Sequence, residues 1–232
     1  MPPAERFAEP MFGVAVTVLA YGAARALHRR WSWAHPLFFT CLAVLGILKL
    51  THVSFADYRT GGSLVQFFLS PATIALGVPL YKQWGKVRKH AGAVVAAIVA
   101  GAASGMAAAG GLVRLLAGSR PVLLSMVPKS VTTPISMEVA RQLGGVPELA
   151  AAFTVTAGLI GSVIGPALLR RAGVRGDLAV GAAMGTSSHG IGTARVLQDS
   201  ELQGGVSGLA MALAGIVTSL LAIPVHWWLG VR

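Results

Sequence analysis

The stretch AGAVVAAIVAGAASGMAAAGGLV, residues 91–113, decides the class of fold. It carries no charged residue along its length, and about 20 mostly apolar residues are enough for a helix to cross a bilayer. An amphipathic helix of a soluble protein would instead carry a charged or polar face opposite its apolar stripe. This stretch therefore predicts a membrane-spanning helix.

Small residues recur at every fourth position within it. Gly101 and Gly105 form a pair, and Ala97 and Ala109 extend the row. Small side chains let membrane helices approach closely, because no hydrophobic effect drives helices together in lipid. The row predicts either packing within the chain, which is the simpler interpretation, or an interface with a second copy. We expect the protein to form a homo-oligomer.

The rest of the chain has the same apolar character. Of its 232 residues, 54% are hydrophobic and 12% are charged, whereas soluble proteins carry about 25% charged residues. The apolar runs lie at 11–27, 37–55, 62–81, 91–117, 149–169 and 204–229, and two interrupted segments lie at 121–143 and 177–198. We predict an all-α polytopic membrane protein with about six to eight membrane segments, two of them broken or re-entrant helices.

No hydrophilic domain or long linker separates these segments, so residues 1–232 are predicted to form a single transmembrane domain. The formal charge of +11 comes from Lys and Arg that cluster at the ends of apolar runs. Cytoplasmic loops of membrane proteins have this pattern. We therefore expect a lipid bilayer, and no nucleic acid, around this chain.

The orientation of the later segments stays open at this stage. The basic loops at 82–90 and 170–176 lie on one side of the membrane if 121–143 is re-entrant, and on opposite sides if it crosses. Short Pro-Ala matches at 71–80 and 166–171 are compatible with an inverted repeat, a common design of transporters.

The first interrupted segment is MVPKSVTTPISMEVARQ, residues 126–142. Pro128 and Pro134 disfavour helix before them, so we predict a half-helix, an unwound stretch and a second half-helix capped by one of the intervening threonines. Unwound backbone in a bilayer is buried in protein or lines a watery cavity. The amide end of the second half-helix, with Lys129, suits an anion. The alternative is an interfacial loop with Lys129 at the lipid headgroups.

The second interrupted segment is MGTSSHGIGTAR, residues 184–195. Its glycines loosen the backbone, and its hydroxyl groups supply neutral donors and acceptors. His189 titrates near physiological pH, which suits proton coupling. The alternative is a hydrogen-bonded structural histidine.

Charged residues beside both segments are candidates for coupling transport to an ion. Glu138 is spaced to pair with Arg141, and Arg195 with Asp199. Ionisable groups inside membrane segments are functional candidates by default. We therefore consider Glu138, His189 and Arg195 as coupling residues, with protons or sodium as the coupled ion.

The sequence offers no sign of an enzyme or of a cofactor. Cys41 is the single cysteine, and the six histidines have no metal-ligand spacing. Ser187 and Ser188 adjoin His189, but adjacency alone does not make a catalytic triad. We expect no catalytic residue, no metal site and no cofactor.

Both interrupted segments also carry a family resemblance. PKSVTTPISME (128–138), followed by GGVP (144–147), and GTSSHGIGTA (185–194) resemble the LrgB/CidB family of bacterial membrane proteins. LSPATIAL (69–76) and residues 204–216 add to the likeness, which covers about residues 40–225. The chain also resembles the carboxy-terminal half of plastid glycolate/glycerate transporters.

The resemblance implies one of two functions in the bacterial cytoplasmic (inner) membrane. The first is secondary transport of a small monocarboxylate of the glycolate, glycerate and pyruvate class. The alternative is a holin- or antiholin-like regulator of murein hydrolase activity and cell lysis. A separate LrgA/CidA-like membrane protein is the partner that the resemblance implies.

For the transporter, the resemblance and the unwound backbone together imply one binding site shared by both segments. Its predicted substrate-binding residues are Lys129, Ser130, Thr132, Thr133, Thr186, Ser187, Ser188, His189 and Thr193.

Overall fold

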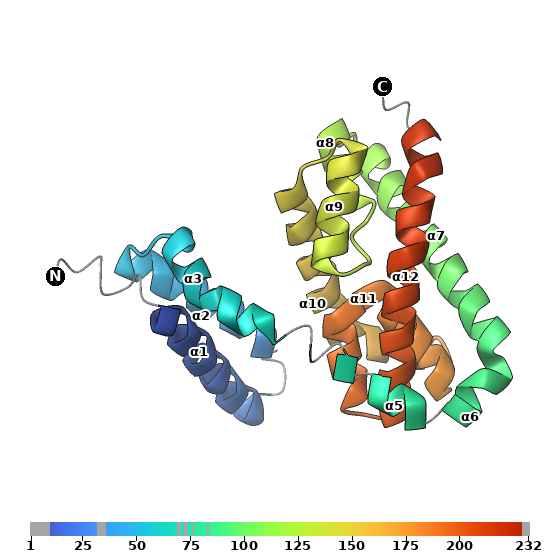
Figure 1. Cartoon of the computed structure of the whole chain (residues 1–232), viewed down its shortest axis with the longest axis horizontal. Coiled ribbons are helices and arrows are strands. Elements are labelled where there is room, and N and C mark those ends of the chain that lie inside the picture. Colours follow the sequence, from blue (N-terminus) through green and yellow to red (C-terminus); the bar gives the residue numbers. More distant parts are fainter. Residues whose placement is uncertain are drawn as a thin grey trace. The chain divides into compact units, whose positions relative to one another are not determined.

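A computed structural model describes the chain at residues 10–31, 36–68, 71, 74–75, 77–82 and 84–228. Its described secondary structure is helical throughout. The chain divides into two compact units, Met1–Ile74 and Ala75–Arg232 (Figure 1).

The first unit consists of α1 (Pro10–Arg30), α2 (Pro36–Thr51) and α3 (Phe55–Phe67). Helix α1 packs against both of the others. A Cβ atom built on Gly13 would lie 2.6 Å from the carbonyl oxygen of Tyr58 and 2.9 Å from Cα of Gly61. Only glycines allow α1 and α3 to cross this closely.

The span predicted at 62–81 is wrong as a single helix. Helix α3 starts at Phe55, after the N-cap Ser54, whose hydroxyl accepts a hydrogen bond from the Asp57 amide at 3.1 Å. It ends at Phe67, and α5 begins at Gly77. The described residues between them, 71, 74 and 75, are helical as well.

The second unit holds the remaining elements. They are α5 (Gly77–Lys82), α6 (Trp84–Val87), the 3₁₀ turn η2 (Arg88–His90), α7 (Ala91–Leu115), α8 (Arg120–Met126), α9 (Thr133–Leu143), α10 (Pro147–Arg171), α11 (Asp177–Leu197) and α12 (Glu201–Trp228). Figure 1 shows α8 and α9 at one end of this unit and α11 towards the other. Helix α11 packs against α7, α10 and α12.

Among the described residues, four helical stretches are long and apolar enough to cross a membrane: Pro10–Arg30, Trp84–Leu115, Pro147–Arg171 and Glu201–Val225. Large apolar side chains lie on their outer surfaces, such as Ile160 with 53% and Ile223 with 61% of the residue exposed. Helix α2 is a shorter apolar helix. An apolar exterior on long helices suits lipid rather than water, and it confirms the predicted polytopic membrane fold.

The first interrupted segment forms a helical hairpin. Helix α8 ends at Met126, and α9 begins after Thr132, which has extended φ and ψ of −64° and 149°. After α9 the chain returns to its starting end, where the Val146 amide donates to Oγ of Ser125 at 2.8 Å. A Cβ on Gly145 would lie 2.9 Å from the carbonyl carbon of Leu124. Hairpin 1 (Arg120–Leu143) therefore re-enters and has its tip near Ser130.

The second interrupted segment is also a hairpin. Helix α11 is broken at His189, with φ 39° and ψ −134°, and Val180, Met184 and Val196 from its two arms share one apolar cluster. Its start and the residues after its end are joined, because Nε2 of Gln203 donates to Oδ1 of Asp177 at 2.7 Å. Hairpin 2 (Asp177–Leu197) therefore re-enters, with its tip at His189.

A long helix followed by a hairpin thus occurs twice, as α7 with hairpin 1 and as α10 with hairpin 2. Hairpin 1 returns the chain to the end of the unit where α7 stopped, so α10 runs back towards the other end. The two pairs are therefore oppositely directed, which supports the predicted inverted repeat. The single domain predicted for residues 1–232 stays a prediction.

Candidate binding site between two hairpin tips

Helix α7 brings the two hairpin tips together. A Cβ on Gly101 would lie 3.0 Å from Cγ2 of Thr186, and a Cβ on Gly105 would lie 3.6 Å from Oγ of Ser130. These glycines are one helical turn apart. The small-residue row of α7 therefore packs within the chain, against hairpin 2 at Gly101 and hairpin 1 at Gly105.

The tip of hairpin 1 combines a cation with a helix start. Pro128, Ser130 and Val131 are buried, while Lys129 is half-buried and donates from Nζ to Oγ of Ser130 at 3.1 Å.

Helix α9 begins at this tip with no side chain capping it. Thr132 occupies the N-cap position, as predicted, yet its hydroxyl makes no capping hydrogen bond. Pro134 lies in the first turn, and the first helical bond runs from the Ser136 amide to the Thr132 carbonyl at 2.9 Å. An uncapped helix start presents amides and a positive dipole end. Thr132 and Thr133 are both half-buried beside it.

At the tip of hairpin 2, His189 adopts a left-handed φ that L-residues rarely adopt. Its carbonyl accepts a hydrogen bond from Oγ1 of Thr193 at 2.8 Å. The arm after the break starts a second half-helix. In both hairpins, therefore, the amide end of a half-helix lies at the tip. Two helix starts and one ammonium group give the region between the tips a positive potential.

Helix α10 fixes the His189 ring. Nε2 of His189 lies 2.9 Å from the carbonyl oxygen of Thr154. Because a carbonyl oxygen only accepts, Nε2 carries the hydrogen, which leaves Nδ1 as the second, proton-accepting nitrogen of the ring. A Cβ on Gly158 would lie 2.7 Å from Cε1 and from Nε2 of His189. Glycine at 158 is what gives the ring its space.

These groups belong to a buried hydrogen-bond chain, defined here as Ser207, Thr193, His189, Thr154 and Ser136. Oγ1 of Thr193 lies 2.8 Å from Oγ of Ser207, and Oγ1 of Thr154 donates to Oγ of Ser136 at 2.8 Å. All four hydroxyl residues have 0% exposure and His189 has 4%. The buried hydrogen-bond chain thus joins α12, His189 and the arm that follows it, α10 and hairpin 1.

The other predicted residues of hairpin 2 bond within their own arm. Oγ1 of Thr186 donates to the Ala182 carbonyl at 2.7 Å, and Oγ of Ser187 donates to the Ala183 carbonyl at 2.7 Å. Ser188 is buried, whereas Ser187 is exposed. Thr186 and Ser188 therefore line the tip, and Ser187 lies at its edge.

The two predicted ion pairs are confirmed. Arg141 contacts Glu138 at 2.7 Å and Arg195 contacts Asp199 at 2.8 Å. The Glu138 side chain is 52% exposed. Among the described residues, neither Glu138 nor Arg195 hydrogen-bonds to a member of the buried hydrogen-bond chain. The structure therefore does not bring them into the cluster around His189.

Comparison with protein-family models matches residues 17–228 to the LrgB-like family. The chain belongs to this family. The match extends beyond the expected 40–225 and includes both hairpins.

Curated relatives align with the LrgB-like chain over nearly their whole length. An uncharacterized protein, YxaC, of Bacillus subtilis (strain 168) is 33% identical over 92% of this chain and 94% of its own. A protein of the same organism named antiholin-like protein LrgB is 32% identical over 93% of this chain and 94% of its own. An uncharacterized protein of Haemophilus influenzae is 33% identical over 89% of this chain and 90% of its own. No solved structure matches the chain.

Three members of the buried hydrogen-bond chain of this LrgB-like protein are not among the residues predicted from the sequence to form the site. Ser136, Thr154 and Ser207 each place a hydroxyl at a fully buried position of a membrane segment. A lone hydroxyl in an apolar run is a weak signal, because Ser and Thr also bond to their own helix backbone. Among the described residues, no group of three or more His, Cys, Asp and Glu side chains could hold a metal ion.

Proposed function

We propose that this LrgB-like protein is a secondary transporter that binds a small monocarboxylate between the two hairpin tips. The observation that carries the proposal is the meeting of the Lys129 tip and the His189 tip on one turn of α7. The class of substrate, glycolate, glycerate or pyruvate, follows from the family resemblance and from the positive potential of the tips.

The energetic cost of placing this arrangement in a bilayer supports the proposal. Broken helices and a buried His are expensive in a bilayer and persist where they line a cavity or are enclosed by protein. In transporters, half-helix starts near the midplane face anionic groups of substrates. Here the start of α9 lies beside Lys129, so a carboxylate would gain amide donors and an ammonium partner together.

We further propose His189 as the proton-coupling group of this transporter. It belongs to the buried chain, whereas Glu138 and Arg195 are held in surface ion pairs. One proton on Nδ1 would add a donor beside the anion. Coupling to sodium is the alternative.

A second candidate function is an antiholin-like regulator of murein hydrolases in the bacterial inner membrane. The names of relatives favour it, since one at 32% identity is called antiholin-like. Such a protein would act by assembling with further copies or with a separate LrgA/CidA-like membrane protein. This function gives no role to the two re-entrant tips, which is why the geometry favours transport.

The test is uptake of labelled pyruvate, glycolate and glycerate by proteoliposomes that hold this chain alone, with and without a proton gradient. We expect saturable uptake of at least one acid, lost in Lys129→Ala and retained in the control Lys86→Ala, an exposed lysine outside the site. Absence of uptake for all three acids, combined with altered lysis of cells that express the chain, would favour the regulator instead.

A further inference from the structure

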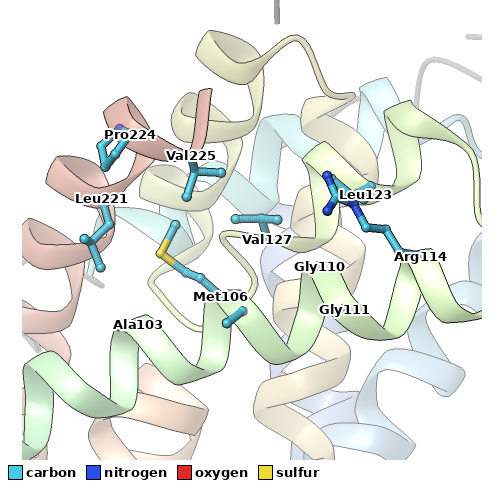
Figure 2. A pocket seen from close by; sticks show the side chains of 11 residues that line it. Ala103, Met106, Gly110, Gly111, Arg114, Leu123, Val127, Leu221, Pro224 and Val225 are labelled. Carbon is cyan, nitrogen blue, oxygen red and sulfur yellow. The ribbon is translucent and has the colours of Figure 1, made fainter. Parts of the chain in front are cut away.

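The second unit contains a pocket of about 320 Å³ between α7, hairpin 1 and α12 (Figure 2). One face of α7, from Ala103 to Arg114, forms one side. Val127 beside α8, and Leu221 with its neighbours on α12, form the others. Arg114 is the one charged residue among those that line it. The pocket is otherwise apolar, so water is a poor occupant.

Two glycines open the pocket. A Cβ on Gly111 would meet no atom within 4 Å, and a Cβ on Gly110 would lie 3.7 Å from Cγ2 of Val127. Helix packing alone therefore does not require glycine at 111. The missing side chain leaves open space along this face of α7.

The length of the pocket suits one acyl chain. Ala103 to Arg114 covers about 16 Å along the helix axis, which is roughly half of the 30 Å hydrocarbon core and so about one leaflet.

The charge lies at the membrane end of the pocket. Ala103 is at the middle of α7 and Arg114 is in its last turn, where the side chain is exposed. Arginine at the end of a span reaches headgroup depth, and its planar guanidinium binds phosphate through two donors. An apolar pocket one leaflet long, with a guanidinium at its outer end, matches the two parts of a phospholipid.

We propose that this pocket binds one acyl chain of an anionic phospholipid, with the lipid phosphate at Arg114. This site is independent of carboxylate binding at the hairpin tips. It makes the contact among α7, α8 and α12 depend on lipid composition.

The test uses the whole protein purified in mild detergent, with native mass spectrometry during titration of phosphatidylglycerol or phosphatidylcholine of the same acyl chains. We expect one phosphatidylglycerol to bind in preference to phosphatidylcholine. Arg114→Gln should weaken phosphatidylglycerol about tenfold, the loss expected for one charge-assisted hydrogen bond. Arg175→Gln, at an exposed arginine after α10, should leave binding unchanged.

A second pair of variants tests the pocket itself. Gly111→Leu fills it and should abolish lipid binding, whereas Gly92→Leu is a matched control on the same helix, because a Cβ there also meets nothing within 4 Å. Circular dichroism and gel filtration check that both variants fold. Equal lipid binding by both, equal affinity for the two lipids, or loss of a dimer in Gly111→Leu without loss of lipid would each overturn the proposal.

Discussion

His189 is the residue at which the local chain conformation and the proposed chemistry meet. Its left-handed φ breaks α11, its carbonyl accepts from Thr193, and its Nε2 donates to the Thr154 carbonyl. Such backbone strain persists only where the surroundings determine it. Here the buried hydrogen-bond chain holds His189 at two points, with Thr193 at its carbonyl and Thr154 at its ring.

Replacement of His189 by Gln tests its coupling role. The Gln amide can still donate to the Thr154 carbonyl, so we expect the protein to insert and fold. It cannot titrate, and uptake should therefore lose its dependence on pH. Uptake is measured in proteoliposomes between about pH 5 and pH 8, the range in which His changes charge. A variant with the pH profile of the original chain would remove His189 from coupling.

Gly158 is a residue whose role is purely steric. Replacement by Ala places a Cβ 2.7 Å from the His189 ring, so the ring or α10 must move. We expect a destabilisation of about 1–3 kcal/mol, as for overpacked cores, measured by unfolding in detergent. Gly92→Ala, where a Cβ meets nothing, serves as control and should not destabilise. Equal stability of the two variants would contradict this account of the ring's position.

At the scale of the elements, α10 is a spanning helix that hydrogen-bonds to both hairpins. Ser136 of hairpin 1 receives a hydrogen bond from Thr154, whose carbonyl receives the one from His189 of hairpin 2. Two re-entrant elements that would otherwise move separately are thus connected through one residue of a spanning helix.

A double-mutant cycle tests this connection. Ser136→Ala and Thr154→Val each remove one partner of the same buried bond, so their effects on unfolding free energy should be non-additive by about 0.5–1.5 kcal/mol. Thr154→Val combined with Thr17→Val serves as control, because Thr17 bonds to Gly13 and Tyr58 in the first unit. Additive effects in the Ser136 pair would show that the bond does not form.

At the scale of the whole molecule, hairpin 1 bears on which side of the membrane the basic loops occupy. If 121–143 re-enters, the basic loops at 82–90 and 170–176 are on one side of the membrane, as the distribution of Lys and Arg requires. The loop between α7 and α8 then lies on the other side. Hairpin 1 thereby removes the conflict that a full crossing by 121–143 would create.

Single cysteines test this topology. In a Cys41→Ser background, Arg175→Cys and Asp199→Cys should react with a membrane-impermeant thiol reagent from the same side, and Gly118→Cys from the opposite side. Spheroplasts and inverted vesicles provide the two sides. Reaction of positions 175 and 199 from opposite sides would mean that α11 crosses the membrane.

The sequence by itself determined the membrane fold, the two broken segments and their polar residues. These follow from local properties: an apolar run spans, proline removes an amide, and glycine permits unusual φ. The ion pairs Glu138–Arg141 and Arg195–Asp199 were predictable too, because helical spacing alone brings them together.

Only the tertiary structure decided that both segments turn back on themselves, that their tips meet at Gly101 and Gly105, and that Ser136, Thr154 and Ser207 complete a buried chain. The physical reason is that these contacts join residues far apart in the sequence. A hydroxyl in an apolar helix has the same local pattern whether it bonds to its own backbone or to a neighbouring helix, so only the packing of α10 and α12 distinguishes the two.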